Sequence, residues 1–186
     1  MTIVMADRGQ ELLGVVHSLH GDLELPEGYR AEIIGGNIAV APSSCGKHAF
    51  ILQDIRDAAF GRLQHGRRLY DNVALEDPDG DRYIPDLALL PDKLMDTRTQ
   101  WVFAMGMCLL AVEVTSPGQE TRDYAKAAGY ARADVPVYLL VDQKRRKCLV
   151  HSEPEGPRYR EVTEIPFGED VILPLEKRIT IDTSRF

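Results

Sequence analysis

Two strongly apolar stretches of the sequence each contain a single carboxylate, and this pattern constrains the fold more than any other feature. The first is residues 83–90 (YIPDLALL), which contains Asp86, and the second is residues 108–115 (CLLAVEVT), which contains Glu113. Apolar runs this short are typical of central strands in a sheet that is covered on both faces. An ionised carboxylate there is costly to desolvate unless a cation or strong donors compensate. The pair therefore predicts two neighbouring strands that hold a metal ion.

The composition indicates one ordinary globular domain. The chain has 186 residues, of which 44% are hydrophobic and 27% are charged, which excludes a disordered or fibrous protein. No apolar run approaches the roughly 20 residues that span a bilayer, and the N-terminus does not resemble a signal peptide. Cys45, Cys108 and Cys148 are widely spaced and form no CxxC pair, which favours reduced thiols. We therefore expect a cytoplasmic protein without membrane contact.

Periodicity and turn signals predict an α/β sandwich, in which helices flank a mixed β-sheet. Helices are expected at residues 8–20, 46–64 and 121–133. A hairpin is expected at residues 29–40, turning at Gly35, Gly36 and Asn37. Further strands are expected at residues 69–75, 83–90, 107–115, 136–141, 147–152, 159–162, 171–173 and 179–181. Residues 1–27 would form a leading helix and its connection, and residues 28–186 would form the rest of one globular unit.

The helix expected at residues 121–133 places a lysine beside the second apolar strand. Asp123, Lys126 and Tyr130 lie at i, i+3 and i+7, so they share one face of this helix. The connection from the preceding strand is short, so the Lys126 ammonium group can reach Glu113. With Asp86 these residues form an acid–acid–base cluster at the end of a sheet. Such a cluster suits phosphodiester hydrolysis with Mg²⁺ or Mn²⁺ bound by oxygen ligands.

Several motifs together resemble one known family. They are Ile84-Pro85-Asp86, VEVTSP at residues 112–117, the helix residues Asp123, Lys126 and Tyr130, and VPVYLLVD at residues 135–142. This pattern resembles the Uma2 family, restriction endonuclease proteins within the PD-(D/E)XK nuclease superfamily. The segment EIIGGNI at residues 32–38 is similar to the E-L-I-D-G-E hairpin of that family. The resemblance covers about residues 28–182, which is nearly the whole chain.

The resemblance implies a restriction-endonuclease-like fold and a metal-dependent endonuclease acting on DNA. Asp86 and Glu113 resemble the acidic metal ligands of the superfamily, and the Val114 carbonyl would be a third ligand. Lys126 resembles the catalytic lysine, moved onto the helix because the chain has no lysine at the ExK position. Glu32 resembles the additional upstream acid that faces the metal. In this family the helix that follows usually carries a histidine, which here is His48. A histidine at such a position more often packs or caps a helix than binds a ligand.

Other charged segments have simpler interpretations. The acidic turn at residues 76–81 resembles a loose calcium loop, but it lacks EF-hand spacing, so we expect an ordinary solvated hairpin. Asp142 is expected to stabilise a turn. Two basic clusters are plausible DNA contacts, although the second also fits a solvated turn: Arg62, Arg67 and Arg68, and residues 144–147.

Two main hypotheses follow. The first is a metal-dependent deoxyribonuclease, which would need a two-fold homodimer to cut both strands because each domain offers one site. The second is a nuclease-fold protein that binds nucleic acid or a protein partner without cutting. It is favoured by the net charge of −7 and by the spacing of Lys126 from Asp123, which is three residues where four are expected. A metallohydrolase with another substrate fits poorly, because an oxygen-only site suits phosphate esters better than zinc hydrolysis.

Overall fold

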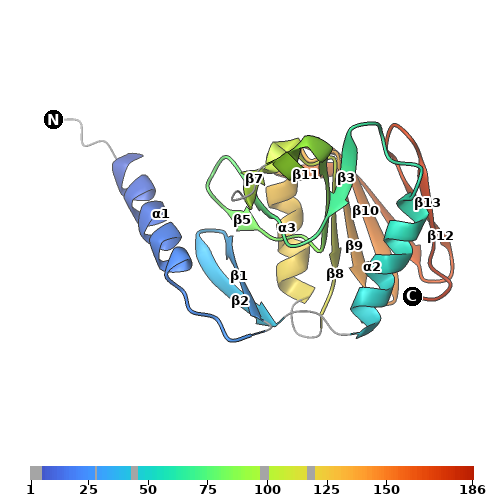
Figure 1. Ribbon diagram of the computed structural model, residues 1–186, viewed down its shortest axis with the longest axis horizontal. Coiled ribbons are helices and arrows are strands. Elements are labelled where there is room, and N and C mark those ends of the chain that lie inside the picture. The colour runs from blue at the N-terminus through green and yellow to red at the C-terminus, as the bar shows by residue number, and fades with distance from the viewer. Residues whose placement is uncertain (1–5, 28, 43–45, 97–100, 117–119) are drawn as a thin grey trace.

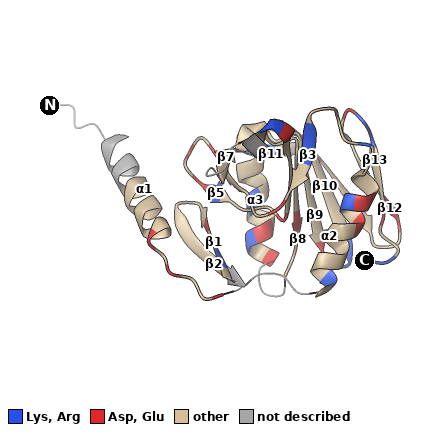
Figure 2. Cartoon of the chain, viewed as in Figure 1, with Lys and Arg blue, Asp and Glu red and all other residues tan. Residues whose placement is uncertain are grey.

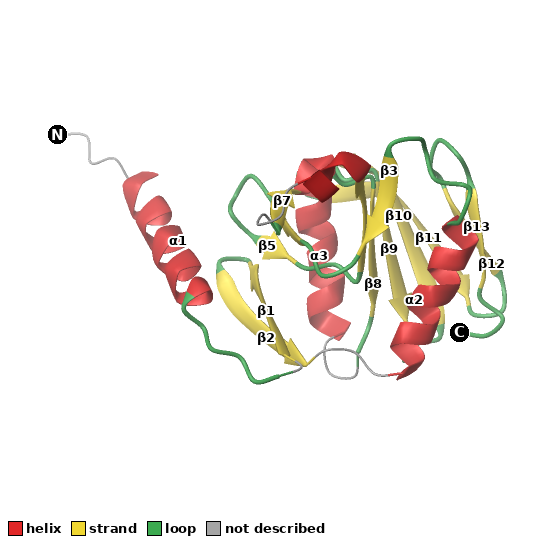
Figure 3. Cartoon of the chain, viewed as in Figure 1, coloured by secondary structure: helices red, strands yellow, loops and turns green. Residues whose placement is uncertain are grey.

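The chain folds into three α-helices and several β-sheets within the residues that the structure describes. The computed structural model describes residues 6–27, 29–42, 46–96, 101–116 and 120–186 (Figure 1). The helices are α1 (Ala6–Gly21), α2 (Gly46–Ala59) and α3 (Glu120–Arg132). Short 3-10 helices lie at Asp92–Asp96 and Met105–Met107. The result is a mixed α/β fold, as the sequence predicts (Figure 3).

The larger sheet contains both carboxylate-bearing stretches. Its six strands have the order β11-β10-β9-β8-β6-β3, and only β8 and β9 pair in parallel. The pairing of β6 with β8, with Leu87 opposite Val112, confirms that the two apolar stretches are neighbouring strands. The strands are β3 (Arg67–Tyr70), β6 (Leu87–Pro91), β8 (Leu110–Val114), β9 (Val137–Asp142), β10 (Lys147–Glu155) and β11 (Arg158–Pro166).

Alternate residues of the central strands face two different helices, because successive side chains of a strand point to opposite faces. One face packs against α2 and contains Leu87, Leu89, Val112 and Val114. The other face packs against α3 and contains Ala88, Leu90, Ala111 and Leu140. Helices α2 and α3 therefore cover opposite faces of the sheet (Figure 1). Glu113 alternates with Val112 and Val114, so its side chain lies on the α3 face.

The smaller sheet has five strands in the order β2-β1-β5-β4-β7. The hairpin β1–β2 turns at Gly35 and Gly36, as predicted, and both glycines have positive φ angles (57° and 69°). The strand β7 is too short to give a sequence signal, and it was not predicted. The strands are β1 (Tyr29–Ile34), β2 (Asn37–Pro42), β4 (Ala74–Glu76), β5 (Arg82–Tyr83) and β7 (Val102–Ala104).

Two predicted strands are each split between the two sheets. The expected strand at residues 69–75 is divided into β3 and β4, and Asn72 between them adopts a left-handed conformation with φ of 54°. The expected strand at residues 83–90 is divided into β5 and β6. Pro85 has no N–H to continue a ladder, and pairing resumes where the Asp86 N–H donates to the Val112 carbonyl at 3.0 Å. The two sheets therefore meet at residues 84–86.

The remaining elements complete the core. Helix α2 ends at Ala59 rather than near Gln64, because Gly61 adopts a left-handed conformation (φ 71°) that ends a helix. The strands β12 (Asp170–Leu173) and β13 (Ile179–Asp182) form a hairpin beside α2. Helix α1 packs near β1, where His20 Nε2 lies 3.1 Å from the Ala31 carbonyl oxygen. The division of the chain at residue 27 stays a prediction.

No helix in the described part of the chain is long and apolar enough to cross a bilayer.

Candidate active site

Asp86 lies at the junction of the two sheets, directly before β6, and its side chain is 3% exposed. Its Oδ2 atom accepts a hydrogen bond from the Val114 N–H at 2.8 Å and lies 2.9 Å from His48 Nε2. Its Oδ1 atom accepts a hydrogen bond from Arg30 Nη2 at 3.2 Å. Groups from β8, α2 and β1 thus converge on one carboxylate, and the histidine expected from the resemblance contacts the site directly.

Lys126 is fully buried and joins two further carboxylates. Its Nζ atom lies 2.8 Å from Glu113 Oε1 and 2.8 Å from Glu32 Oε1. Asp123 Oδ1 lies 3.9 Å away on the same helix. The Tyr130 hydroxyl donates to the Glu113 oxygen that accepts from Lys126, at 3.1 Å. The structure therefore brings together the predicted Glu32, Glu113 and Lys126, with the other two members of the predicted helix face.

Close packing of α3 against the smaller sheet makes this arrangement possible. A Cβ atom at Gly129 would lie 2.2 Å from the Tyr83 hydroxyl oxygen, so only glycine permits this approach. Tyr83 also packs edge-on against Tyr130, with ring centroids 5.3 Å apart. The Ile84 N–H donates to Glu32 Oε1 at 2.7 Å, which fixes the Glu32 carboxylate at the sheet junction.

Burial, together with the crowding of carboxylates, raises the pKa of two acids. Burial raises the pKa of Glu113 to about 8; nearby Asp86, Glu32 and Asp123 act in the same direction, whereas Lys126 opposes them. Burial likewise raises the pKa of Asp123 to about 6. These residues are called the acid cluster: the carboxylates of Glu32, Asp86, Glu113 and Asp123, with the Lys126 ammonium group. The acid cluster therefore favours a cation in its interior.

The other two acids are kept ionised by their cationic neighbours. Burial opposes ionisation of Asp86, but the His48 hydrogen bond and the Arg30 charge lower its pKa below the usual value. Burial also opposes ionisation of Glu32, but Lys126 and Arg30 lower its pKa. Burial lowers the pKa of Lys126 itself, and the surrounding carboxylates outweigh that effect and raise it. The ammonium group is therefore a permanent positive charge in the cluster.

Two arginines of the cluster were not predicted from the sequence. Arg30 pairs with Asp86, and Arg122 Nη2 lies 3.7 Å from Glu32 Oε2. Arg122 Nε also lies 3.7 Å from Asp123 Oδ1. Arg30 and Glu32 are alternate residues of β1, so a period of two could have placed both on one face. Arg122 gives no comparable signal, because its approach to Glu32 depends on tertiary packing.

The donor chemistry of the cluster fits an oxygen-coordinated divalent cation. Asp86 and Glu113 supply carboxylates, and the Val114 carbonyl leaves β8 on the same side as the Val114 N–H, which donates to Asp86. Glu32 Oε2 is buried, without a hydrogen-bond partner among the described residues. Within the described ranges, however, no three His, Cys, Asp or Glu side chains form a ready-made ligand group. The carboxylates pair with protein cations instead, so a metal ion would compete with these cations for the carboxylate oxygens.

The whole-chain comparison identifies the family. Residues 19–183 match the Uma2 family, which is described as "Putative restriction endonuclease". The chain belongs to the Uma2 family. Its fold resembles a crystal structure described as that of "a putative nuclease belonging to DUF820" from Anabaena variabilis. The two chains are 18% identical, with a TM-score of 0.65 over 82% of this chain and 84% of that chain, which supports the predicted fold. No curated protein matches the chain.

The two basic clusters of this Uma2 protein lie at opposite ends of the larger sheet. The turn at residues 144–147 follows β9, whose parallel partner β8 ends beside Glu113, so this turn lies at the same end as the acid cluster. Arg67 and Arg68 lie opposite Pro91 and Leu90, at the other end of β6 from Asp86. Figure 2 shows the basic part of β3 well away from the charged first turns of α3, which carry part of the acid cluster.

Asp142 stabilises the turn after β9, as predicted. Its carboxylate accepts hydrogen bonds from the Arg145 N–H and from the Tyr124 hydroxyl, both at 2.8 Å. Burial would raise the pKa of Asp142, but these hydrogen bonds and the Arg145 guanidinium lower it below its usual value. The residue has a structural role and does not contact the acid cluster in any described interaction.

The acidic turn at residues 76–81 is less solvated than predicted. Asp77 and Asp81 are buried, and Arg132 Nη2 lies 3.1 Å from Asp77 Oδ2 and 3.6 Å from Asp81 Oδ2. The N–H groups of Gly35 and Gly36 donate to the Asp81 carboxylate at 2.8 and 2.9 Å. These aspartates therefore attach the turn to α3 and to the β1–β2 hairpin.

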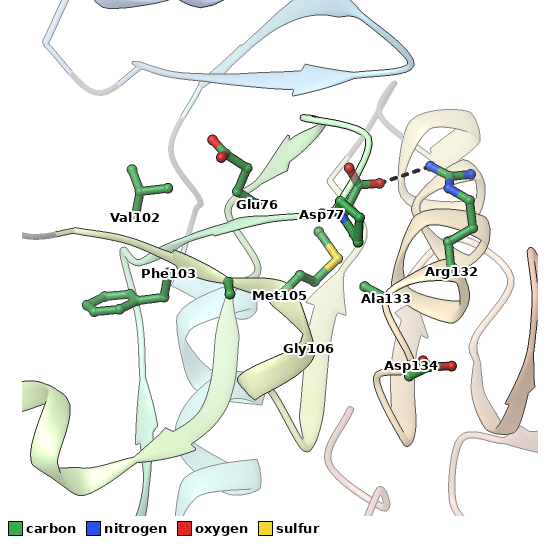
Figure 4. Close-up of a pocket in the computed structure, with 11 residues that line it drawn as sticks. Glu76, Asp77, Val102, Phe103, Met105, Gly106, Arg132, Ala133 and Asp134 are labelled. Carbon is green, nitrogen blue, oxygen red and sulfur yellow. Dashed lines mark hydrogen bonds and ion pairs between the residues drawn. The ribbon is translucent and has the colours of Figure 1, made fainter.

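A cavity of about 580 Å³ lies beside this turn, at the C-terminal end of α3 (Figure 4). Arg132 and Asp77 meet at its edge, and Phe103 and Met105 contribute apolar surface. It contains no member of the acid cluster. The acid cluster of this Uma2 protein lies elsewhere, at the sheet junction.

Proposed function

We propose that this Uma2 protein is a metal-dependent nuclease that hydrolyses phosphodiester bonds in DNA. The observation that carries this proposal is the fully buried Lys126, which joins Glu113 of the larger sheet to Glu32 of the smaller sheet beside Asp86. Burying several ionised groups is costly, and replacing them with apolar residues is often neutral or stabilising. A purely structural role therefore gives little reason for this cluster, whereas hydrolysis of a phosphate ester needs both its acids and its fixed cation.

Each residue has a role that follows from its position. Asp86, Glu113 and the Val114 carbonyl would hold Mg²⁺ or Mn²⁺, which supplies a more acidic water and neutralises charge on the phosphate. Lys126 holds its proton at Nζ and provides a fixed positive charge toward the reacting groups. Glu32 keeps the ammonium group in place through its 2.8 Å contact.

The proposed substrate and setting follow from the same site. One chain offers one acid cluster, so cutting both strands of a duplex would use a homodimer with two-fold symmetry. The turn at residues 144–147 lies at the same end of the sheet as the cluster and is a plausible contact for DNA phosphates. We place the protein in the cytoplasm, where the buried free thiols of Cys108 and Cys148 would stay reduced.

One observation favours a second function, in which the protein binds nucleic acid or a protein partner without cutting. Asp86 already accepts a hydrogen bond from Arg30, and Lys126 already neutralises Glu113. In this alternative Arg30 and Lys126 stay paired with these carboxylates, and the cluster binds no metal. Calorimetric titration with Mg²⁺ and Mn²⁺ separates the two functions, because the alternative predicts no binding that depends on Asp86.

Cleavage of plasmid and single-stranded DNA in Mg²⁺ or Mn²⁺ tests the proposal directly. We expect the wild type to cut, and we expect Asp86→Asn and Lys126→Met to lose at least about a hundredfold in rate. Asp170→Asn is the matched control, because Asp170 is an exposed acid of β12. A folded wild type that cuts neither DNA with either metal would refute the nuclease proposal.

A further inference from the structure

Two arginines border the acid cluster where solvent reaches it. The Arg30 side chain is 22% exposed and the Arg122 side chain is 15% exposed, whereas Lys126 is 0% exposed. Arg30 projects from β1 on the same face as Glu32, and Arg122 approaches Glu32 from the first turn of α3. The two guanidinium groups therefore lie beside two carboxylates of the cluster, Asp86 and Glu32, and their partial exposure lets a ligand contact them.

Most hydrogen-bond donors of these two arginines have no acceptor among the residues that the structure describes. Within the described residues, Arg30 makes one side-chain hydrogen bond, from Nη2 to Asp86, and its buried Nε has no acceptor. The two ion pairs of Arg122 are 3.7 Å long, which exceeds hydrogen-bond distance, and its buried Nε also lacks an acceptor. Buried donors without acceptors are unfavourable, so both groups would gain from a ligand that brings anionic oxygens.

The chemistry of that ligand follows from the guanidinium group. Its planar arrangement of several donors matches the oxygens of a phosphate, which can accept two parallel hydrogen bonds. The fixed carboxylates nearby do not fill these donors, whereas a phosphate at the exposed edge of the cluster would bring further acceptor oxygens. We propose that Arg30 and Arg122 form a site for a backbone phosphate of nucleic acid, next to the acid cluster. This assignment rests on the proposed function for the identity of the ligand.

Binding measured without metal tests this site independently of cleavage. A short fluorescein-labelled DNA duplex is titrated in EDTA, over a series of salt concentrations, with the wild type, Arg30→Gln, Arg122→Gln and the double variant. The matched control is Arg160→Gln, which removes one exposed arginine from β11. Thermal unfolding of each variant establishes that it is folded. Arg30→Lys keeps the charge without the planar group of donors.

We expect each single variant to bind the duplex about tenfold more weakly and to reduce the slope of log K against log salt by about one. Arg160→Gln should change neither quantity, and Arg30→Lys should keep the slope while losing affinity. Competition with inorganic phosphate distinguishes the source of the ligand. Loss of phosphate binding in the double variant, with DNA binding unchanged, would overturn the assignment to nucleic acid.

Failure of this inference and failure of the nuclease proposal give different results. If the wild type binds DNA without cutting it, and binding depends on both arginines, the phosphate site stands and the catalytic proposal fails. If the wild type cuts DNA while both glutamine variants bind like the wild type, the phosphate site is refuted and the nuclease proposal stands. A folded wild type that binds no DNA also overturns the site.

Discussion

Replacing Lys126 with methionine should destabilise the protein by about 3–5 kcal/mol. The methionine fills nearly the same space but leaves Glu32 and Glu113 without the cation that lies 2.8 Å from each. Removing one partner of a buried ion pair costs this amount because the remaining charge stays in the interior. Glu113 can take up a proton, since its pKa is already raised to about 8, and this limits the loss. In a chain of this size each kcal/mol lowers Tm by roughly 2–4 °C, so we expect a fall of about 6–20 °C.

Thermal unfolding followed by circular dichroism at neutral pH measures this change. Lys177→Met is the control, because Lys177 is exposed and its replacement should change the free energy of unfolding by at most about 0.5 kcal/mol. Adding Glu113→Gln to Lys126→Met should recover part of the loss, because one unpaired carboxylate is then neutral. If Lys126→Met melts together with the wild type, the lysine does not hold the two carboxylates, and the reasoning is wrong.

Three further predictions concern other parts of the fold. Gly129→Ala should cost about 1–3 kcal/mol in a denaturant titration, because the new methyl group would overlap the Tyr83 hydroxyl, and an unchanged midpoint would contradict the close packing. Cys108 and Cys148 should resist iodoacetamide in the native protein, since burial raises both thiol pKa values to about 12, and peptide mapping by mass spectrometry should find label on them only after unfolding. Asp142→Asn should make the free energy of unfolding depend less on pH at the acid end. The pKa of the Asp142 carboxyl is lowered in the folded protein, so the carboxylate stabilises the fold above its unfolded pKa of about 3.8. This contribution is lost as the pH falls through the folded pKa. An Asp142→Asn variant with the same pH dependence as the wild type at the acid end would refute that contribution.

The central strands and the lysine-bearing helix could be predicted because local patterns determine them. The apolar runs around Asp86 and Glu113 leave no exposed face, which is typical only of interior strands. The spacing of Asp123, Lys126 and Tyr130 gives a common helix face whatever the rest of the fold does. These two patterns, with the short connection between strand and helix, predict that Glu113 and Lys126 lie together.

The features that sequence reasoning missed depend on contacts between distant segments. The apolar pattern continues unbroken across Pro85, so it gives no sign that residues 83 and 87 belong to different sheets. Arg30 and Arg122 look like ordinary surface arginines, because their partners come from other elements. The burial of Asp77 was missed for the same reason, since its cation lies at the end of α3.

The contact between Lys126 and Glu32 joins two parts of the fold that do not share a sheet. Glu32 belongs to the β1–β2 hairpin, whereas Lys126 and Glu113 belong to the layer formed by α3 and the larger sheet. In the part of the chain that the structure describes, the larger sheet draws its strands from residues 67–166 and makes no strand pairing with the hairpin, so the hydrogen bonds of that sheet do not depend on the hairpin. A chain in which the hairpin has opened would therefore keep the hydrogen-exchange protection of the larger sheet and still lack a complete acid cluster. Docking of the hairpin therefore completes the cluster, because a copy with the hairpin undocked would lack Glu32 beside Lys126.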